Sequence, residues 1–217
     1  MNTGLLAILS LLPIGAVAGF GTPAAICVPL LVGLGFPPLA AVASGMIIQS
    51  TPVSFEAAGT PILIGVNNGL STDGSIKDYA ASLGLGWNEF LSLIGTKAAY
   101  LHGTAGVLVP LIVVCFLTRF FGKNRSWREG LAVWKFAAFA ASAMIVPYVL
   151  VARALGPEFP SLFGGMLGLV VVTTAARKGF LMPAKETYWE FDKKVFNHPQ
   201  AALGGATPEQ DEPGRKI

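Results

Sequence analysis

Long apolar runs separated by short polar blocks are the main feature of the chain. The first run covers residues 1–66 and is interrupted repeatedly by glycine and proline, and a polar block over residues 67–95 follows it. A helix needs about 20 residues to cross a hydrocarbon core of about 30 Å. Three later runs reach or approach this length, so each predicts a membrane-spanning helix: Ala98–Thr118, Val133–Ala152 and Pro160–Ala176.

This pattern predicts an all-α integral membrane protein. Broken or re-entrant helices form the N-terminal third, and three conventional transmembrane helices follow. The expected segments are an apolar broken-helix region with the candidate site (1–66), an extracytoplasmic polar loop with an amphipathic piece (67–95), the three spans (96–176) and a polar, partly disordered cytoplasmic tail (177–217).

Composition agrees with a bilayer as the solvent. Hydrophobic residues make up 53% of the chain and charged residues 12%, whereas soluble domains carry about 25% charged residues. Glu56 is the only charged side chain in the first 72 residues. The basic residues lie in short blocks between apolar runs and not on one face of a folded domain, so we expect no nucleic-acid partner.

The start of the chain allows one other interpretation, a cleaved signal peptide. Leu5–Leu12 would be its apolar core and Ala16–Ala18 its cleavage site. No lysine or arginine precedes this core, and the apolar sequence continues beyond the site. Both observations favour a retained membrane segment.

Basic residues predict the orientation in the membrane. The loop between the second and third spans holds Arg153 alone, offset by Glu158. Because cytoplasmic loops carry an excess of lysine and arginine, we expect residues 122–131 and the C-terminal tail to be cytoplasmic. The residues that carry this prediction are Arg119, Lys123, Arg125, Arg128, Arg177, Lys178 and Lys185.

Three Thr-Pro steps interrupt the first apolar run, at Thr22-Pro23, Thr51-Pro52 and Thr60-Pro61. Threonine is a good N-cap, and proline is favoured at the first helical position, so each step is a candidate helix start. Helix N-termini carry free N–H groups that attract anions, and discontinuous membrane helices bind anionic substrates in this way. The alternative is that each proline only kinks a transmembrane helix.

Glycine and hydroxyl residues around these steps predict an anion-binding site inside the membrane. Glycine lets a ligand approach the backbone closely, and hydroxyls add hydrogen-bond donors. The candidate substrate-binding residues are Gly19, Phe20, Gly21, Thr22, Pro23, Ser50, Thr51, Pro52, Ser54, Gly59 and Thr60.

Two titratable side chains are candidates for proton coupling, Glu56 and His102. A lone carboxyl in an apolar membrane segment is a functional candidate by default. The alternative for Glu56 is a place at the water interface, at the tip of a break. The alternative for His102, near the outer end of its span, is a hydrogen-bonded interfacial group.

The blocks around the Thr-Pro steps together resemble the L-lactate permease family. They follow one another in the family's order and spacing, and the resemblance covers most of residues 15–183. The matching blocks are Gly19–Ala25, Leu31–Phe36, Pro38-Leu39, Ser50–Phe55, Gly59–Ile62 and Leu155–Pro160.

This resemblance implies proton-coupled uptake of L-lactate, or of a related 2-hydroxy monocarboxylate such as glycolate. It also implies a multi-pass protein of the bacterial inner membrane, with a small monocarboxylate, protons and the lipid bilayer as its partners. Three departures matter. Residues 13–16 lack the acidic residue usual in the family before the Gly-Phe-Gly block, Glu56 replaces a small residue, and family members are more than twice as long. We therefore expect a central portion of a permease, completed by a second chain or an oligomer.

Two other functional classes compete with transport. A membrane-embedded enzyme using Glu56 and His102 lacks support, because the sequence shows no metal-ligand spacing, cofactor motif or nucleophile–base pair, and we expect no cofactor. A membrane scaffold, or a truncated fragment without transport activity of its own, would need only packing residues such as those of Ala137–Ala143. It would leave the Thr-Pro steps and Glu56 unexplained.

Overall fold

The computed structural model describes residues 22–50, 53–183 and 188–192, and their regular structure is helical. This confirms the all-α prediction. The described helices are α2 (Thr22–Gly33), α3 (Pro38–Gln49), η1 (Val53–Phe55), α4 (Glu56–Thr60), η2 (Pro61–Val66), α5 (Asn67–Leu70), α6 (Gly74–Ser82), α7 (Trp87–Gly106), α8 (Val109–Phe120), α9 (Trp127–Leu131), α10 (Trp134–Leu155) and α11 (Pro160–Arg177).

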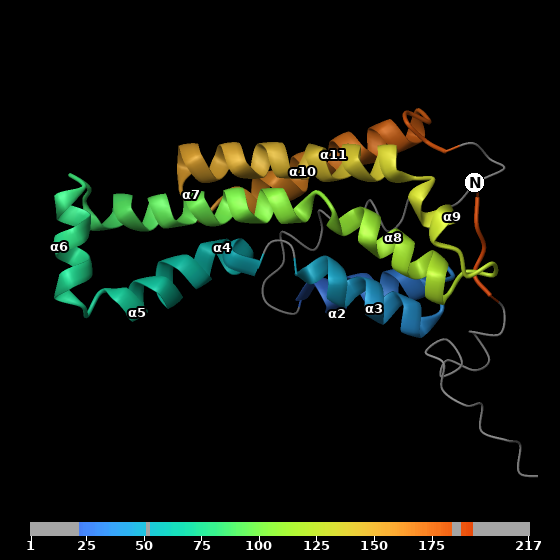
Figure 1. The fold of residues 1–217 in the computed structure, drawn as a ribbon, viewed down its shortest axis with the longest axis horizontal. Helices are drawn as coiled ribbons and strands as arrows, with labels where there is room; N and C mark the ends of the chain where they lie inside the picture. The colour runs from blue at the N-terminus through green and yellow to red at the C-terminus, as the bar shows by residue number, and fades with distance from the viewer. Residues whose placement is uncertain (1–21, 51–52, 184–187, 193–217) are drawn as a thin grey trace, which may run out of the picture.

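Three helical units of the described residues are long and apolar enough to cross a membrane, which confirms the three predicted spans. The first joins α7 and α8 over Trp87–Phe120, with an interruption just before Pro110, whose missing N–H cannot continue the helix. Helix α10 packs along this unit, and α11 packs along α10 (Figure 1).

The first span begins at Trp87, upstream of the predicted Ala98. Gly103 lies against Ile145 and Val149, in the middle of α10. His102 therefore lies level with the middle of the bundle, and its predicted place near the outer end of a span is wrong. The turn between α10 and α11 lies level with Gly95, which faces Pro157.

Helices α2 and α3 form a hairpin that packs against α8 (Figure 1). The turn between them uses Gly35 with a φ of 92°, a backbone conformation that glycine adopts without steric cost. Phe36, in the same turn, is buried in a core shared by α2, α3, α8 and α10. The α2–α3 hairpin therefore packs onto the spans through a continuous apolar core.

The region between η1 and η2 leaves helical geometry, as the predicted broken helix requires. Ala57, Ala58 and Gly59 all have positive φ, at 48°, 54° and 76°. Helix η2 begins at Pro61, as the Thr60-Pro61 step predicts. Thr60 has helical backbone angles and its side chain makes no cap hydrogen bond, so only the predicted capping by its hydroxyl is wrong. Its hydroxyl donates instead to the Ala57 carbonyl, because the chain has already turned before Thr60. Thr51-Pro52 lies outside the described residues.

Candidate functional site

The break, defined as Ala57–Gly59, packs tightly against the turn between α10 and α11. A Cβ atom on Gly59 would lie 2.3 Å from the Pro157 carbonyl oxygen, so only glycine fits there. The Ser161 hydroxyl of α11, which is buried, donates to the Phe55 carbonyl at 2.8 Å. These two contacts fix one side of the non-helical backbone against protein, while Ala57 and Ala58 are exposed in the described chain. Non-helical backbone at membrane depth needs such cover from protein or a lined cavity.

A chain of three polar side chains connects the broken region to two spans. Ser54 Oγ lies 3.3 Å from His102 Nε2, and His102 Nδ1 lies 3.1 Å from the Tyr148 hydroxyl. A neutral imidazole donates at one nitrogen and accepts at the other. The hydrogen bonds can therefore run in either direction along the three side chains, according to the tautomer of His102.

Glu56 lies beside this chain of side chains. Its side chain is 1% exposed, and Oε1 has no hydrogen-bond partner. It is close enough to Tyr148 to interact with it electrostatically. The buried position contradicts a place at the water interface. A buried polar atom without a hydrogen-bond partner is rare in proteins, and a specific one calls for an explanation.

The Phe55 side chain packs against the polar groups and belongs to the apolar protein core beside them. Its ring meets the ring of His102 edge to face at 6.1 Å and that of Tyr148 at 5.1 Å. Aromatic contacts of this kind fix the ring orientations. Ser54, Glu56, His102 and Tyr148, with Phe55 between them, are called the polar cluster below.

The structure places only part of the predicted site in the polar cluster. Ser54 belongs to it, and Gly59 lies in the adjacent break. Ser50 is exposed, and its hydroxyl donates to the carbonyl of Ile47 in its own helix. Thr22 and Pro23 begin the described part of α2, where their backbone is helical. The predicted residues outside the described residues are Gly19, Phe20, Gly21, Thr51 and Pro52.

Sequence reasoning missed Tyr148 and Ser161. Both lie in apolar runs that the hydrophobic pattern marks only as spans. The signal available for Tyr148 was a phenol in the middle of a span, next to Pro147, since a buried tyrosine hydroxyl normally has a hydrogen-bond partner. Its partner His102 is 46 residues away in the sequence, so the sequence pattern could not predict that the two side chains meet.

A polar cavity of about 430 Å³ opens at the end of the bundle beside the break. It shares Pro157 with the wall against Gly59, and Leu63 of η2 also lines it. Arg153 and Glu158 bring opposite charges to its wall. Three or more His, Cys, Asp or Glu side chains arranged to hold a metal are not found among the described residues.

Comparisons with known proteins place the chain among permeases. A family model described as L-lactate permease matches residues 7–202. A provisionally named L-lactate permease of Haemophilus influenzae is 36% identical over 161 residues, which are 74% of this chain and 26% of that protein. The glycolate permease GlcA of Escherichia coli is 31% identical over 153 residues (70% and 23%), and the L-lactate permease of the same species 28% over 156 (72% and 24%).

The chain thus spans about a quarter of the length of the curated relatives that it matches. No solved structure matches it.

Proposed function

The chain belongs to the L-lactate permease family, and from this premise we propose that it forms the substrate-site portion of a permease for L-lactate or a related 2-hydroxy monocarboxylate. The membrane would be the bacterial inner membrane, and protons would drive uptake. Relatives named for L-lactate and for glycolate support this substrate class. The proposal includes the rest of the permease, or a further chain, as the partner that completes the site.

The polar cluster is the observation that carries this proposal. In an apolar environment, a carboxylate is bound only where donors replace its hydration. Ser54, His102 and Tyr148 bring such donors together from η1, α7 and α10. A 2-hydroxy acid offers both a carboxylate and a hydroxyl, which match a set of groups that both donate and accept.

Proton coupling follows from the charge of the substrate. Moving an anion inward against an inside-negative potential costs about 2.3 kcal/mol per 100 mV. One proton carried with it cancels this term. We assign the proton to the Glu56 and His102 pair, because Oε1 of Glu56 has no partner and His102 can pass a proton between its two nitrogens.

The charge at the two ends of the bundle supports the proposed orientation. Where α8 and α11 end and α10 begins, the described residues are rich in lysine and arginine. The opposite end carries α6 (Figure 1), and the polar cavity lies toward that end, beside the turn between α10 and α11. The basic end and the C-terminal tail would be cytoplasmic, so the polar cavity would open outward, and Arg153 would attract the monocarboxylate there. The basic residues are Arg119, Lys123, Arg125, Arg128, Lys135, Arg177 and Lys178.

Uptake of labelled L-lactate into vesicles that contain the chain tests the proposal, with and without an inward proton gradient. If the site is complete, we expect saturable uptake that rises with the gradient. Glycolate should inhibit this uptake more strongly than acetate does. Acetate lacks the 2-hydroxyl, so equal competition would contradict the substrate class. The inserted protein should be tested alone and together with the remaining permease segments. If it neither takes up nor binds L-lactate in either case, a scaffold role would replace transport as the function.

A further inference from the structure

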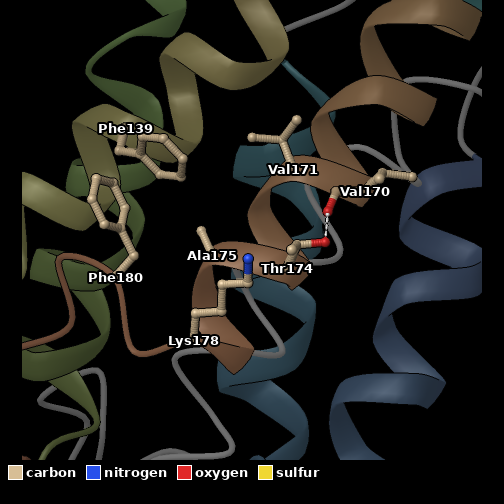
Figure 2. Close-up of a pocket in the computed structure, with 7 residues that line it drawn as sticks. All are labelled: Phe139, Val170, Val171, Thr174, Ala175, Lys178 and Phe180. Atoms are coloured by element: carbon tan, nitrogen blue, oxygen red, sulfur yellow. Dashed lines mark hydrogen bonds between the residues drawn. The ribbon is translucent and has the colours of Figure 1, made fainter.

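An apolar groove lies on the surface formed by α10, α11 and the turn that follows α11. Its volume is about 520 Å³, within the range of about 300–1,000 Å³ typical of small-molecule sites. Figure 2 shows Phe139 and Phe180 on one side and the α11 side chains on the other. The α11 wall consists of Val170, Val171, Thr174 and Ala175.

The turn after α11 builds one side of this groove. Gly179 and Leu181 have φ values of 70° and 55°, which reverse the chain directly after the helix. Phe180 between them returns to α10, where its ring meets that of Phe139 at 5.3 Å. A leucine in the left-handed region is uncommon. Backbone hydrogen bonds from Gly179 to the Ala176 carbonyl and from Phe180 to the Ala175 carbonyl hold the turn.

The polar atom in the groove wall is satisfied within its own helix. Thr174 Oγ1 donates to the Val170 carbonyl at 2.6 Å (Figure 2). The groove therefore offers its ligand apolar surface, apart from one charged side chain, Lys178, at the end of α11. Lys178 is exposed, forms no ion pair with a described residue, and points its amine along the groove (Figure 2).

We propose that this groove binds an anionic phospholipid, with an acyl chain between the phenylalanines and the valines and the phosphate at Lys178. The apolar wall lies on two helices that are long enough to span a membrane, and Lys178 lies at the end of its span, where headgroups begin. The other lysines and arginines at this end of the bundle add attraction for anionic lipid.

Photo-crosslinking tests the site on the chain in phosphatidylcholine vesicles that contain a small fraction of photoactivatable lipid. The label is carried on the acyl chain of either phosphatidylglycerol or phosphatidylcholine, and cross-linked peptides are mapped by mass spectrometry. We expect phosphatidylglycerol to label Val170–Lys178 more strongly than phosphatidylcholine does. K178Q should reduce the labelling by phosphatidylglycerol about fivefold, as the loss of one lysine near an anionic headgroup implies.

Two further variants keep the test specific. A175F fills the groove and should reduce labelling by both lipids. K135Q removes a lysine near the start of α10, at the same end of the bundle but outside the groove, and should reduce labelling of 170–178 much less than K178Q does. Circular dichroism of each variant confirms that the helices are intact.

Equal labelling by the two lipids in the wild-type chain would overturn the proposal, as would K178Q and K135Q with the same effect. Cross-links from this region to a second copy, or to another segment of the permease, in place of lipid would show that protein covers the groove and would also overturn it.

Discussion

At the residue scale, Glu56 directly precedes three residues in the left-handed backbone region. This conformation costs an alanine about 1–2 kcal/mol, and both Ala57 and Ala58 adopt it. Such strain persists only where the surroundings hold it, and it concentrates at functional sites. Here the buried Ser161 hydroxyl and the close approach of Gly59 to Pro157 hold it.

The hydrogen bond between Ser54 and His102 predicts the effect of S54A on uptake. A typical side-chain hydrogen bond contributes about 0.5–1.5 kcal/mol, so we expect L-lactate uptake to fall about two- to tenfold while membrane insertion is unchanged. S50A is the matched control, because the Ser50 hydroxyl is exposed and donates only to its own helix. Equal loss in both variants would remove Ser54 from the site.

If Glu56 carries the coupled proton, removing its ability to ionise should uncouple L-lactate transport from the proton gradient. Glutamine keeps the shape of the side chain but cannot carry a proton. We expect E56Q to abolish accumulation driven by the proton gradient and to preserve exchange of labelled for unlabelled L-lactate. D78N, at an exposed aspartate of α6, serves as the control. Accumulation at the wild-type level in E56Q would assign the proton to another group.

Gly59 predicts a large loss of stability on substitution. In G59A, the new Cβ would lie 2.3 Å from backbone at Pro157, and the φ of 76° would be strained as well. Overpacking alone costs about 1–3 kcal/mol, so the thermal midpoint in detergent should fall by several degrees. G65A is the control, since a Cβ there meets nothing within 4 Å; a similar fall in G65A would contradict the packing at Gly59.

At the scale of the elements, α6 shows how a short helix is held at the end of the bundle. Asp73 caps it, and its carboxylate accepts from the Ser75 amide at 2.9 Å and from the Ser75 hydroxyl at 2.7 Å. These hydrogen bonds, chiefly that from the hydroxyl, lower the pKa of Asp73 below its ordinary value of 3.8. Ionised Asp73 is therefore the form that stabilises the helix.

This cap predicts a pH dependence of α6. The lowered pKa means that the stabilisation is complete above the ordinary pKa of an aspartate and is lost as the pH falls through the lowered value. Hydrogen exchange at the Ser75 amide should accelerate in D73A at neutral pH, but not in D78A, which removes an exposed carboxylate from the same helix. Unchanged exchange in D73A would show that α6 does not depend on its cap.

The length of the first span and the close packing of α11 are two features that the lengths of the apolar runs do not show. Helices α7 and α8 form one 34-residue unit, longer than a bilayer requires, so the first turns of α7 project past the α10–α11 turn. Gly164 and Gly168 let α11 approach α10 at Tyr148 and Met144, where a Cβ on either glycine would lie about 3 Å from α10 atoms. This close approach helps to fix the position of Tyr148 in the polar cluster.

At the scale of the whole molecule, the described residues leave much apolar surface open. The exposed side of the break includes Val53, Ala57 and Ala58, and Phe159 and Phe163 of the α11 end are also exposed. Since the chain spans about a quarter of its relatives' length, we expect the remaining permease segments to complete the wall of the site on this side.

Orientation is testable on the intact molecule. In a background without the buried Cys27 and Cys115, a cysteine at Ser82 should react with an impermeant maleimide in intact cells. A cysteine at Asn124, an exposed residue at the basic end, should react only after the membrane is permeabilised. The reverse pattern would place the polar cavity on the cytoplasmic side and contradict the proposed outer entrance.

The sequence alone determined that the protein lies in a membrane, how many conventional spans it has, and that a helix breaks near Glu56. These features depend on apolar run length, charge distribution and proline chemistry, which are local properties of the sequence. It also determined the family, through blocks of glycine, threonine and proline. Tertiary structure alone decided which polar groups meet. Ser54 and His102 are 48 residues apart in the sequence, and His102 and Tyr148 are 46 apart. Only the packing of α7, α10 and α11 around the break brings their side chains together. The same packing placed the positive-φ turn at Ala57–Gly59, directly before the helix start at Thr60-Pro61, through the contacts with Pro157 and Ser161.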